Sequence, residues 1–247
     1  MSGVVVVTGG SRGIGASTAR LFARRGWVVC IGYRQQAADA HHVVEACQAR
    51  GVAAVAVPGA VTSADDVAAL FAAADGPGPI AALVNNAGIV DRRARLDEMT
   101  TGRLERMFAV NVIGPFLCAG EAVRRMSRRH GGSGGAIVNL SSAAARLGSP
   151  GEYVDYAASK GAIDTMTLGL AREVADEGIR VNAVRAGLIH TDIHASGAQP
   201  DRIERLEGDI PMRRAGLPAE VASAVVWLCS GEATYVAGAI VDVGGGR

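Results

Sequence analysis

Tyr156 and Lys160 are the residues best suited to proton transfer, and they lie four positions apart. On a helix, that spacing puts both side chains on one face. A tyrosine with a pKa of about 10 is a poor base, but a nearby ammonium favours the phenolate and lowers its pKa. Lys160 is the single lysine among 25 basic residues. The pair therefore predicts a general acid/base. The alternative is an ordinary solvated pair. Tyr153 has no such partner, because Ala157 follows it at the same spacing.

A glycine-rich stretch, Thr8-Gly9-Gly10-Ser11-Arg12-Gly13-Ile14-Gly15, follows the first apolar run of the chain. Between a strand and a helix, such a loop lets backbone N–H groups approach a pyrophosphate at the helix N-terminus. The stretch therefore predicts a dinucleotide site, with a ligand-free turn as the alternative. It is not a P-loop, because no Gly-Lys-Ser/Thr ends it.

Short apolar runs alternate with longer amphipathic stretches along the whole chain. Strands are expected at 4–7, 27–32, 53–58, 80–84, 135–140, 180–184 and 239–243. Helices are expected near 17–25, 37–50, 64–74 with Ser63 as N-cap, 103–129 with an interruption at Gly114-Pro115, 155–176 and 218–230. This alternation predicts an α/β fold: one doubly wound, mostly parallel sheet of Rossmann type with helices on both faces. The strands are continuous apolar runs, as strands buried on both faces are.

We expect a single dinucleotide-binding catalytic domain over residues 1–247, since no repeat or low-complexity linker divides the chain. The stretch 190–215 is polar, irregular and too long for an ordinary loop. We interpret it as the segment on the substrate side.

The composition excludes several classes of protein. A net charge of +1 with 49% hydrophobic residues argues against disorder, and gives no electrostatic reason to expect nucleic acid. The four cysteines are far apart and form no CxxC, which predicts free, buried thiols in a reducing compartment. The apolar run at 4–7 is too short for a signal peptide or a membrane span. We therefore expect a cytoplasmic protein with no membrane partner.

The glycine spacing resembles that of the short-chain dehydrogenase/reductase family, whose signature is Thr-Gly-x-x-x-Gly-x-Gly. The other family motifs follow in family order, so the resemblance covers residues 3 to 246. They are Asn85-Asn86-Ala87-Gly88, Asn111, Ser141-Ser142, Tyr156 to Lys160, Arg180-Val181-Asn182-Ala183-Val184 and Asp242-Val243-Gly244-Gly245. Two positions depart from the family pattern. Ala60 stands where an aspartate for the adenine amino group is usual, and Ala186 stands where a proline is usual.

The resemblance implies an NADP(H)-dependent oxidoreductase that transfers a hydride between nicotinamide and a carbonyl/secondary alcohol pair. It also implies a small-molecule carbonyl or alcohol substrate and a homotetramer. The main alternative is a catalytically silent dinucleotide-binding sensor on the same fold. The intact Ser/Tyr/Lys set argues against it. An isomerase or dehydratase using bound cofactor is a further alternative.

By the same resemblance, the catalytic residues are Asn111, Ser142, Tyr156 and Lys160. Ser142 would donate a hydrogen bond to the substrate oxygen, while Ser141 at a strand end faces the other side. Asn111 would hold a water that links Lys160 to solvent. Its alternative is a helix-kink residue near Gly114-Pro115.

The second strand ends in Tyr33-Arg34 with no acidic residue, and an acid there would select NAD. Arg34 and Arg12 therefore predict NADP(H) in preference to NAD(H) through a 2′-phosphate. The alternative is two solvated surface arginines. No metal is expected, because His190 and His194 have only Asp192 as a further ligand nearby. The expected cofactor-binding residues are Gly9, Ser11, Arg12, Gly13, Ile14, Gly15, Tyr33, Arg34, Val61, Asn86, Ala87, Gly88, Tyr156, Lys160, Gly187, Ile189 and Thr191.

Overall fold

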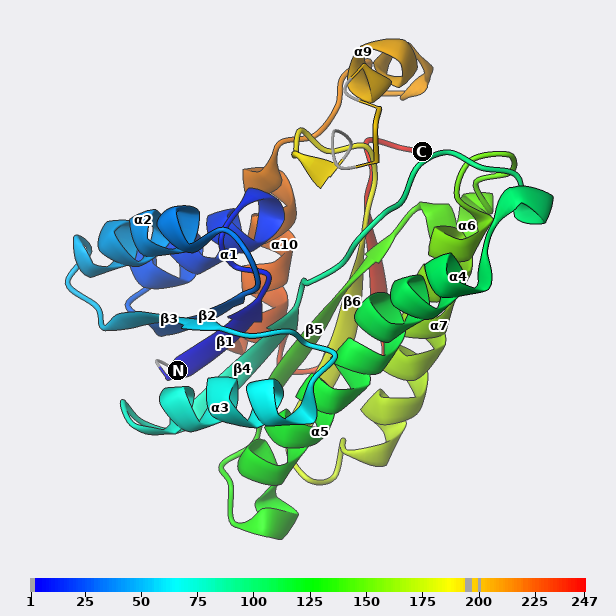
Figure 1. The fold of residues 1–247 in the computed structure, drawn as a ribbon. Coiled ribbons are helices and arrows are strands. Elements are labelled where there is room, and N and C mark those ends of the chain that lie inside the picture. Colours follow the sequence, from blue (N-terminus) through cyan, green and yellow to red (C-terminus); the bar gives the residue numbers. More distant parts are fainter. Residues whose placement is uncertain (1–2, 194–196, 200) are drawn as a thin grey trace.

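A seven-stranded parallel sheet lies at the centre of the computed structural model, which describes residues 3–193, 197–199 and 201–247 (Figure 1). The strand order is β3-β2-β1-β4-β5-β6-β7. The strands are β1 (Val4–Thr8), β2 (Val28–Tyr33), β3 (Ala54–Pro58), β4 (Ile80–Asn85), β5 (Gly135–Ser142), β6 (Ile179–Ala186) and β7 (Ile240–Val243). The predicted fold class and all seven strand positions are confirmed, with boundaries that differ by at most two residues at each end.

Helices cover both faces of the sheet. One face is covered by α1 (Gly13–Arg24), α2 (Ala37–Gln48) and α10 (Pro218–Cys229), and the other by α3 (Ala64–Asp75), α5 (Gly114–Met126) and α7 (Val154–Glu173). The remaining helices described are α4 (Thr101–Phe108), α6 (Ala144–Leu147) and α9 (Arg202–Leu206). Ser63 caps α3 as expected, since its hydroxyl accepts a hydrogen bond from the Asp66 N–H.

The core has two halves, one on each side of the sheet. Successive strand side chains point to opposite faces. Val5 and Val7 therefore pack with Phe22 beneath α1, whereas Val4 and Val6 pack with Phe71 beneath α3. All four valines are buried. This two-sided burial explains why the strand is a continuous apolar run rather than an alternating one.

The four cysteines are free and buried, as the sequence predicts. Burial raises the pKa of the thiols of Cys30, Cys118 and Cys229 to about 12. These thiols therefore contribute packing rather than reactivity.

Residues 101 to 126 form one continuous helical segment rather than the interrupted helix that we expected. A short π-helix, Ala109–Ile113, joins α4 to α5. Pro115 has no N–H to donate to the carbonyl of Asn111 four residues earlier, and the wider turn takes up this irregularity. Gly114 is required for packing, because a Cβ there would lie 2.7 Å from Cγ2 of Val61. By length and composition alone this segment could cross a membrane, but core helices of soluble proteins meet the same criterion.

The strand order reverses between β1 and β4, so the loops that follow these two strands diverge at the carboxyl edge of the sheet. In open α/β sheets, ligands bind in the crevice at such a point. The segment after β6 rises above this edge and carries α9 (Figure 1).

Candidate active site

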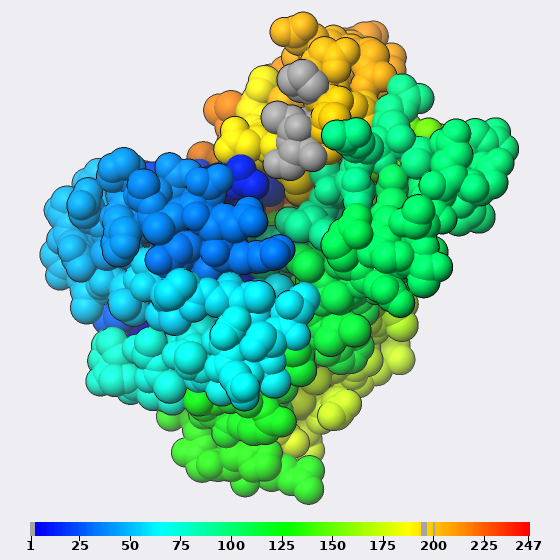
Figure 2. Space-filling model, in the orientation of Figure 1, coloured from blue at the N-terminus to red at the C-terminus, as the bar shows by residue number. Residues whose placement is uncertain are grey.

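A cavity of about 710 Å³ opens along the carboxyl edge of the sheet. Its walls come from the loops after β1 to β6 and from α7. Figure 2 shows the surface hollowed between the blue N-terminal segments and the green middle of the chain. The expected site residues that line the cavity are Gly9, Ser11, Arg12, Gly13, Ile14, Tyr33, Arg34, Val61, Asn86, Ala87, Gly88, Ser142, Tyr156, Lys160, Gly187, Ile189 and Thr191.

The glycine loop leaves room for a phosphate group at the start of α1. Arg12, the N-cap of that helix, is extended and makes no side-chain cap, and Gly13 and Ile14 of the first turn line the cavity. Gly9 has a φ of +62°, and a Cβ there would lie 2.9 Å from the Cα of Ala87. These features fit the pyrophosphate of a dinucleotide. Gly15 is buried instead, where a Cβ would lie 2.3 Å from the Gly9 carbonyl, so it serves packing.

Asn86 ties the loop after β4 to the loop after β1. Its side-chain Nδ2 donates to the carbonyls of Thr8 and Gly9, both at 2.9 Å. In return, the Thr8 hydroxyl accepts hydrogen bonds from the N–H groups of Asn86 and Ala87. Asn86 therefore fixes the two walls of the crevice relative to each other, and its side chain acts on the loops directly.

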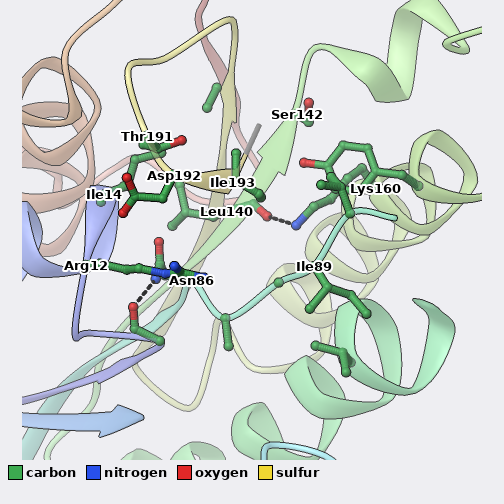
Figure 3. Close-up of a pocket in the computed structure, with 18 of the residues that line it drawn as sticks. Arg12, Ile14, Asn86, Ile89, Leu140, Ser142, Lys160, Thr191, Asp192 and Ile193 are labelled. Carbon is green, nitrogen blue, oxygen red and sulfur yellow. Dashed lines mark hydrogen bonds between the residues drawn. The ribbon is translucent and has the colours of Figure 1, made fainter. Parts of the chain in front are cut away.

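Tyr156 and Lys160 lie one turn apart on α7, with the Lys160 Nζ 5.7 Å from the centre of the tyrosine ring. Nζ donates a hydrogen bond of 2.7 Å to the carbonyl of Leu140 at the end of β5 (Figure 3). Figure 3 places Ser142 and Lys160 on one side of the cavity and Arg12, Ile14 and Thr191 on the other.

Burial dominates the electrostatics of this pair. It lowers the pKa of Lys160 to about 8, against an opposing effect of the Asp164 carboxylate. Burial also raises the pKa of Tyr156, while a hydrogen bond with Ser142 and the charge of Arg202 lower it. Lysine at this pKa is still largely charged at neutral pH, whereas the tyrosine is protonated.

The two serines at the end of β5 have different surroundings. The Ser141 hydroxyl is buried and donates to the carbonyl of Lys160 in α7. The Ser142 hydroxyl lies at the cavity and accepts from the Ala144 N–H at 3.2 Å. Ser142 is therefore the serine whose hydroxyl lies beside Tyr156.

Asn111 is fully buried and does not line the cavity. Its side chain accepts from the Ile89 N–H at 2.8 Å and donates to the Ile89 carbonyl and to the Ser159 hydroxyl. Asn111 Oδ1 and Lys160 Nζ both lie close to Gly88. A Cβ built on this glycine would be 3.4 Å from the first atom and 3.6 Å from the second. The Asn111 side-chain amide thus holds the loop after β4, and Asn111 also lies in the π-helical turn that precedes Pro115.

The part of the cavity beside the end of β3 contains a carboxylate that the sequence did not reveal. The Ala60 N–H donates to Oδ2 of Asp66 at 2.8 Å, and both residues line the cavity. Asp66 therefore brings an acidic group to the position where Ala60 lacks one. No sequence motif identified Asp66, because it lies on α3, six residues after Ala60. Arg34 and Arg12 are exposed at the cavity rim.

A second group that the sequence did not reveal is the Arg202 guanidinium, whose charge acts on Tyr156. The Arg202 guanidinium stacks 5.1 Å from the centre of the Tyr153 ring and bonds to Glu152 at 2.6 Å. All three residues line the cavity. No spacing in the sequence indicates this contact, because Arg202 and Glu152 are 50 residues apart in the chain.

No group of three metal-ligating side chains occurs within the described ranges. His190 is exposed, and His194 lies outside the described residues.

Comparison with known proteins extends over nearly the whole chain. A family profile described as enoyl-(acyl carrier protein) reductase matches residues 9–247. An uncharacterized oxidoreductase of Escherichia coli, YgfF, is 51% identical over 245 residues, covering 99% of both chains. The 3β-hydroxysteroid dehydrogenase 1 of Eggerthella lenta is 39% identical, covering 98% of this chain and 92% of its own.

Solved structures agree with these relatives. A blue fluorescent protein from a metagenomic library, in complex with NADPH, is 33% identical with a TM-score of 0.90, covering 99% of this chain and 97% of its own. A short-chain dehydrogenase from Burkholderia cenocepacia, in complex with NADP, is 31% identical with a TM-score of 0.90, covering 98% and 96%. The glycine loop, the parallel sheet and these relatives together establish that the chain belongs to the short-chain dehydrogenase/reductase family of nicotinamide-dependent oxidoreductases.

Proposed function

We propose that the protein is an NADP(H)-dependent enzyme that interconverts a small-molecule ketone or aldehyde and its alcohol. The observation that carries the proposal is the common cavity shared by Ser142, Tyr156 and Lys160 and by the glycine loop. A silent sensor requires only the loop. The chain acts as one catalytic domain over 1–247, with 190–215 on the substrate side.

A bound nicotinamide supplies or accepts the hydride. For reduction, the Tyr156 hydroxyl gives its proton to the substrate oxygen, which the Ser142 hydroxyl holds by hydrogen bonding. The Lys160 ammonium stabilises the resulting phenolate and holds the ribose beside it. The Asn111 carbonyl, which Pro115 cannot serve, would hold the water that returns a proton to Lys160. Asp66 and the Val61 backbone would bind the adenine.

The direct test is NADPH oxidation by the purified protein with a panel of ketones and aldehydes of graded size. Turnover with at least one of them supports the proposal. Tight NADPH binding without turnover across such a panel would favour the sensor instead.

The cofactor preference gives a separate prediction. Arg34, with Arg12 across the rim, should contact the 2′-phosphate of NADP(H), and one such contact contributes about 1.5–3 kcal/mol, or roughly ten- to a hundredfold in affinity. Wild type should therefore prefer NADPH to NADH, and Arg34→Ala should erode that preference chiefly by raising the NADPH KM. The ratio of kcat/KM for the two cofactors measures this in both proteins. A wild-type ratio at or below unity would show that these arginines do not bind the phosphate.

Assembly gives a further prediction. The helical segment Thr101–Met126 leaves an apolar face exposed. Only 39% of its most apolar 18-residue stretch is buried within the chain. The side chains of Ile113 and Phe116 on it are 52% and 54% exposed. We expect another copy of the chain to cover this face in a homotetramer. Light scattering should give about four times the chain mass of 25.2 kDa, and Phe116→Glu should give a smaller species. A wild-type protein that scatters as a 25.2 kDa monomer would contradict the prediction.

A further inference from the structure

Asp164 continues the spacing of Tyr156 and Lys160 along α7, one further turn down the helix. Residues four apart on a helix are neighbours on its surface, so Lys160 lies between the tyrosine and this carboxylate. Lys160 is 5% exposed and Asp164 is 8% exposed. Two opposite charges are thus buried one turn apart on α7, with no direct ion pair between them among the described residues.

Among the described residues, one oxygen of the Asp164 carboxylate has a hydrogen-bond donor and the other has none. Oδ2 accepts from the Arg185 Nε on β6 at 2.9 Å. Oδ1 is buried and makes no hydrogen bond within the part of the chain that the structure describes. A buried carboxylate oxygen without a donor is costly, and the ion pair with Arg185 satisfies only one of the two oxygens of Asp164.

The charges around Asp164 alternate in sign toward the surface. Arg185 also lies 3.8 Å from Asp242 on β7, and Asp242 lies 3.6 Å from Arg146 on α6. On the cavity side, Lys160 has the Leu140 carbonyl at 2.7 Å, and the charge of Arg202 acts on Tyr156. Asp164 is the acidic group whose charge raises the pKa of Lys160, against the larger lowering by burial.

We propose that Asp164, held in place by Arg185, is a positioning residue that keeps the Lys160 ammonium charged for its work on Tyr156. The inference rests on the proposed function for the role of Lys160. A neutral lysine would still fill the same space, but it would no longer favour the phenolate. Without the carboxylate, burial alone would act on the ammonium, and Lys160 would lose its proton at lower pH.

The test compares Asp164→Asn with wild type by two measurements. Because Lys160 is the only lysine, protein labelled with 15N at the lysine Nζ gives one side-chain resonance, whose titration reports its pKa directly. We expect this titration to move to lower pH in Asp164→Asn. The fall of kcat/KM for reduction at high pH should move with it. The variant should lose about three- to tenfold in activity near pH 8 and little near pH 6, where Lys160 is charged in both proteins.

Asp242→Asn is the matched control, because it removes the same charge from the same network on the far side of Arg185. It should leave both the Lys160 titration and the pH profile in place. An unchanged Lys160 titration in Asp164→Asn would overturn the inference, and so would an equal shift in Asp242→Asn. If the Lys160 titration shifts but the pH profile of kcat/KM does not, the Lys160 charge does not control the reaction. That result would contradict both the catalytic role of Lys160 and the positioning role of Asp164.

Discussion

Replacing Tyr156 by Phe is expected to lower kcat by about a hundred- to ten-thousandfold, the range that a general acid/base contributes. The ring would still fill its place on α7, and the glycine loop would be untouched, so NADPH affinity should change little. Stopped-flow turnover and NADPH fluorescence titration measure the two quantities. Tyr235→Phe, at a fully exposed tyrosine, is the control and should keep wild-type kcat. Residual turnover within tenfold of wild type would exclude Tyr156 as the acid.

Lys160→Arg should also abolish turnover, although this substitution keeps the positive charge. The lysine reaches the Leu140 carbonyl from a buried position 5.7 Å from the tyrosine ring centre, and the larger planar guanidinium does not fit a point-charge site. Near-normal activity of this variant would show that any cation serves, and that the role given to the ammonium is wrong.

The second large effect concerns stability at the start of α7. Arg103 on α4 holds Asp155, the residue before Tyr156, through two hydrogen bonds of 2.7 and 3.0 Å, and both side chains are buried. A third bond of 2.6 Å runs from Arg103 to the Arg92 carbonyl. Arg103→Leu would leave a buried carboxylate without its partner. We expect a loss of about 3–5 kcal/mol in the free energy of unfolding.

Urea denaturation measures this loss of stability. Two further variants serve as controls. Arg95→Ala removes an exposed partner of Asp97, so it should cost less than about 1 kcal/mol. Arg103→Leu combined with Asp155→Leu removes both charges and should recover much of the stability, because well-packed apolar residues replace buried ion pairs at little cost. A single variant that loses no more than Arg95→Ala would contradict the prediction.

The strands and the Tyr156–Lys160 pair were readable from the sequence because each depends on local pattern. Continuous valines identify a strand buried on both faces, and a four-residue spacing identifies one face of a helix. The beginning of α1 was placed at 17 instead of Gly13, since glycines are poor helix formers and only the loop geometry makes Gly13 the first helical residue.

The residues that were missed owe their positions to tertiary contacts. Asp66 reaches Ala60 because Ser63 caps α3 and turns the chain back on itself. Arg202 on α9 stacks on Tyr153, a residue far from it in the chain. No spacing in the chain encodes either approach, so single-sequence reasoning could not supply them.

The π-helix at Ala109–Ile113 also affects which side of the helix its buried residues occupy. Arg103, Met107, Asn111 and Pro115 are buried and follow one another at four residues, and Ala119 continues the series. In a regular α-helix each such step rotates by about 40° past a full turn, so the series would wind away from the sheet. The wider turn removes part of that rotation. The buried positions of both halves thereby stay on one side of the helix, where α4 packs against α7 and α5 packs against β4 and β5, and Asn111 lies where the correction is made.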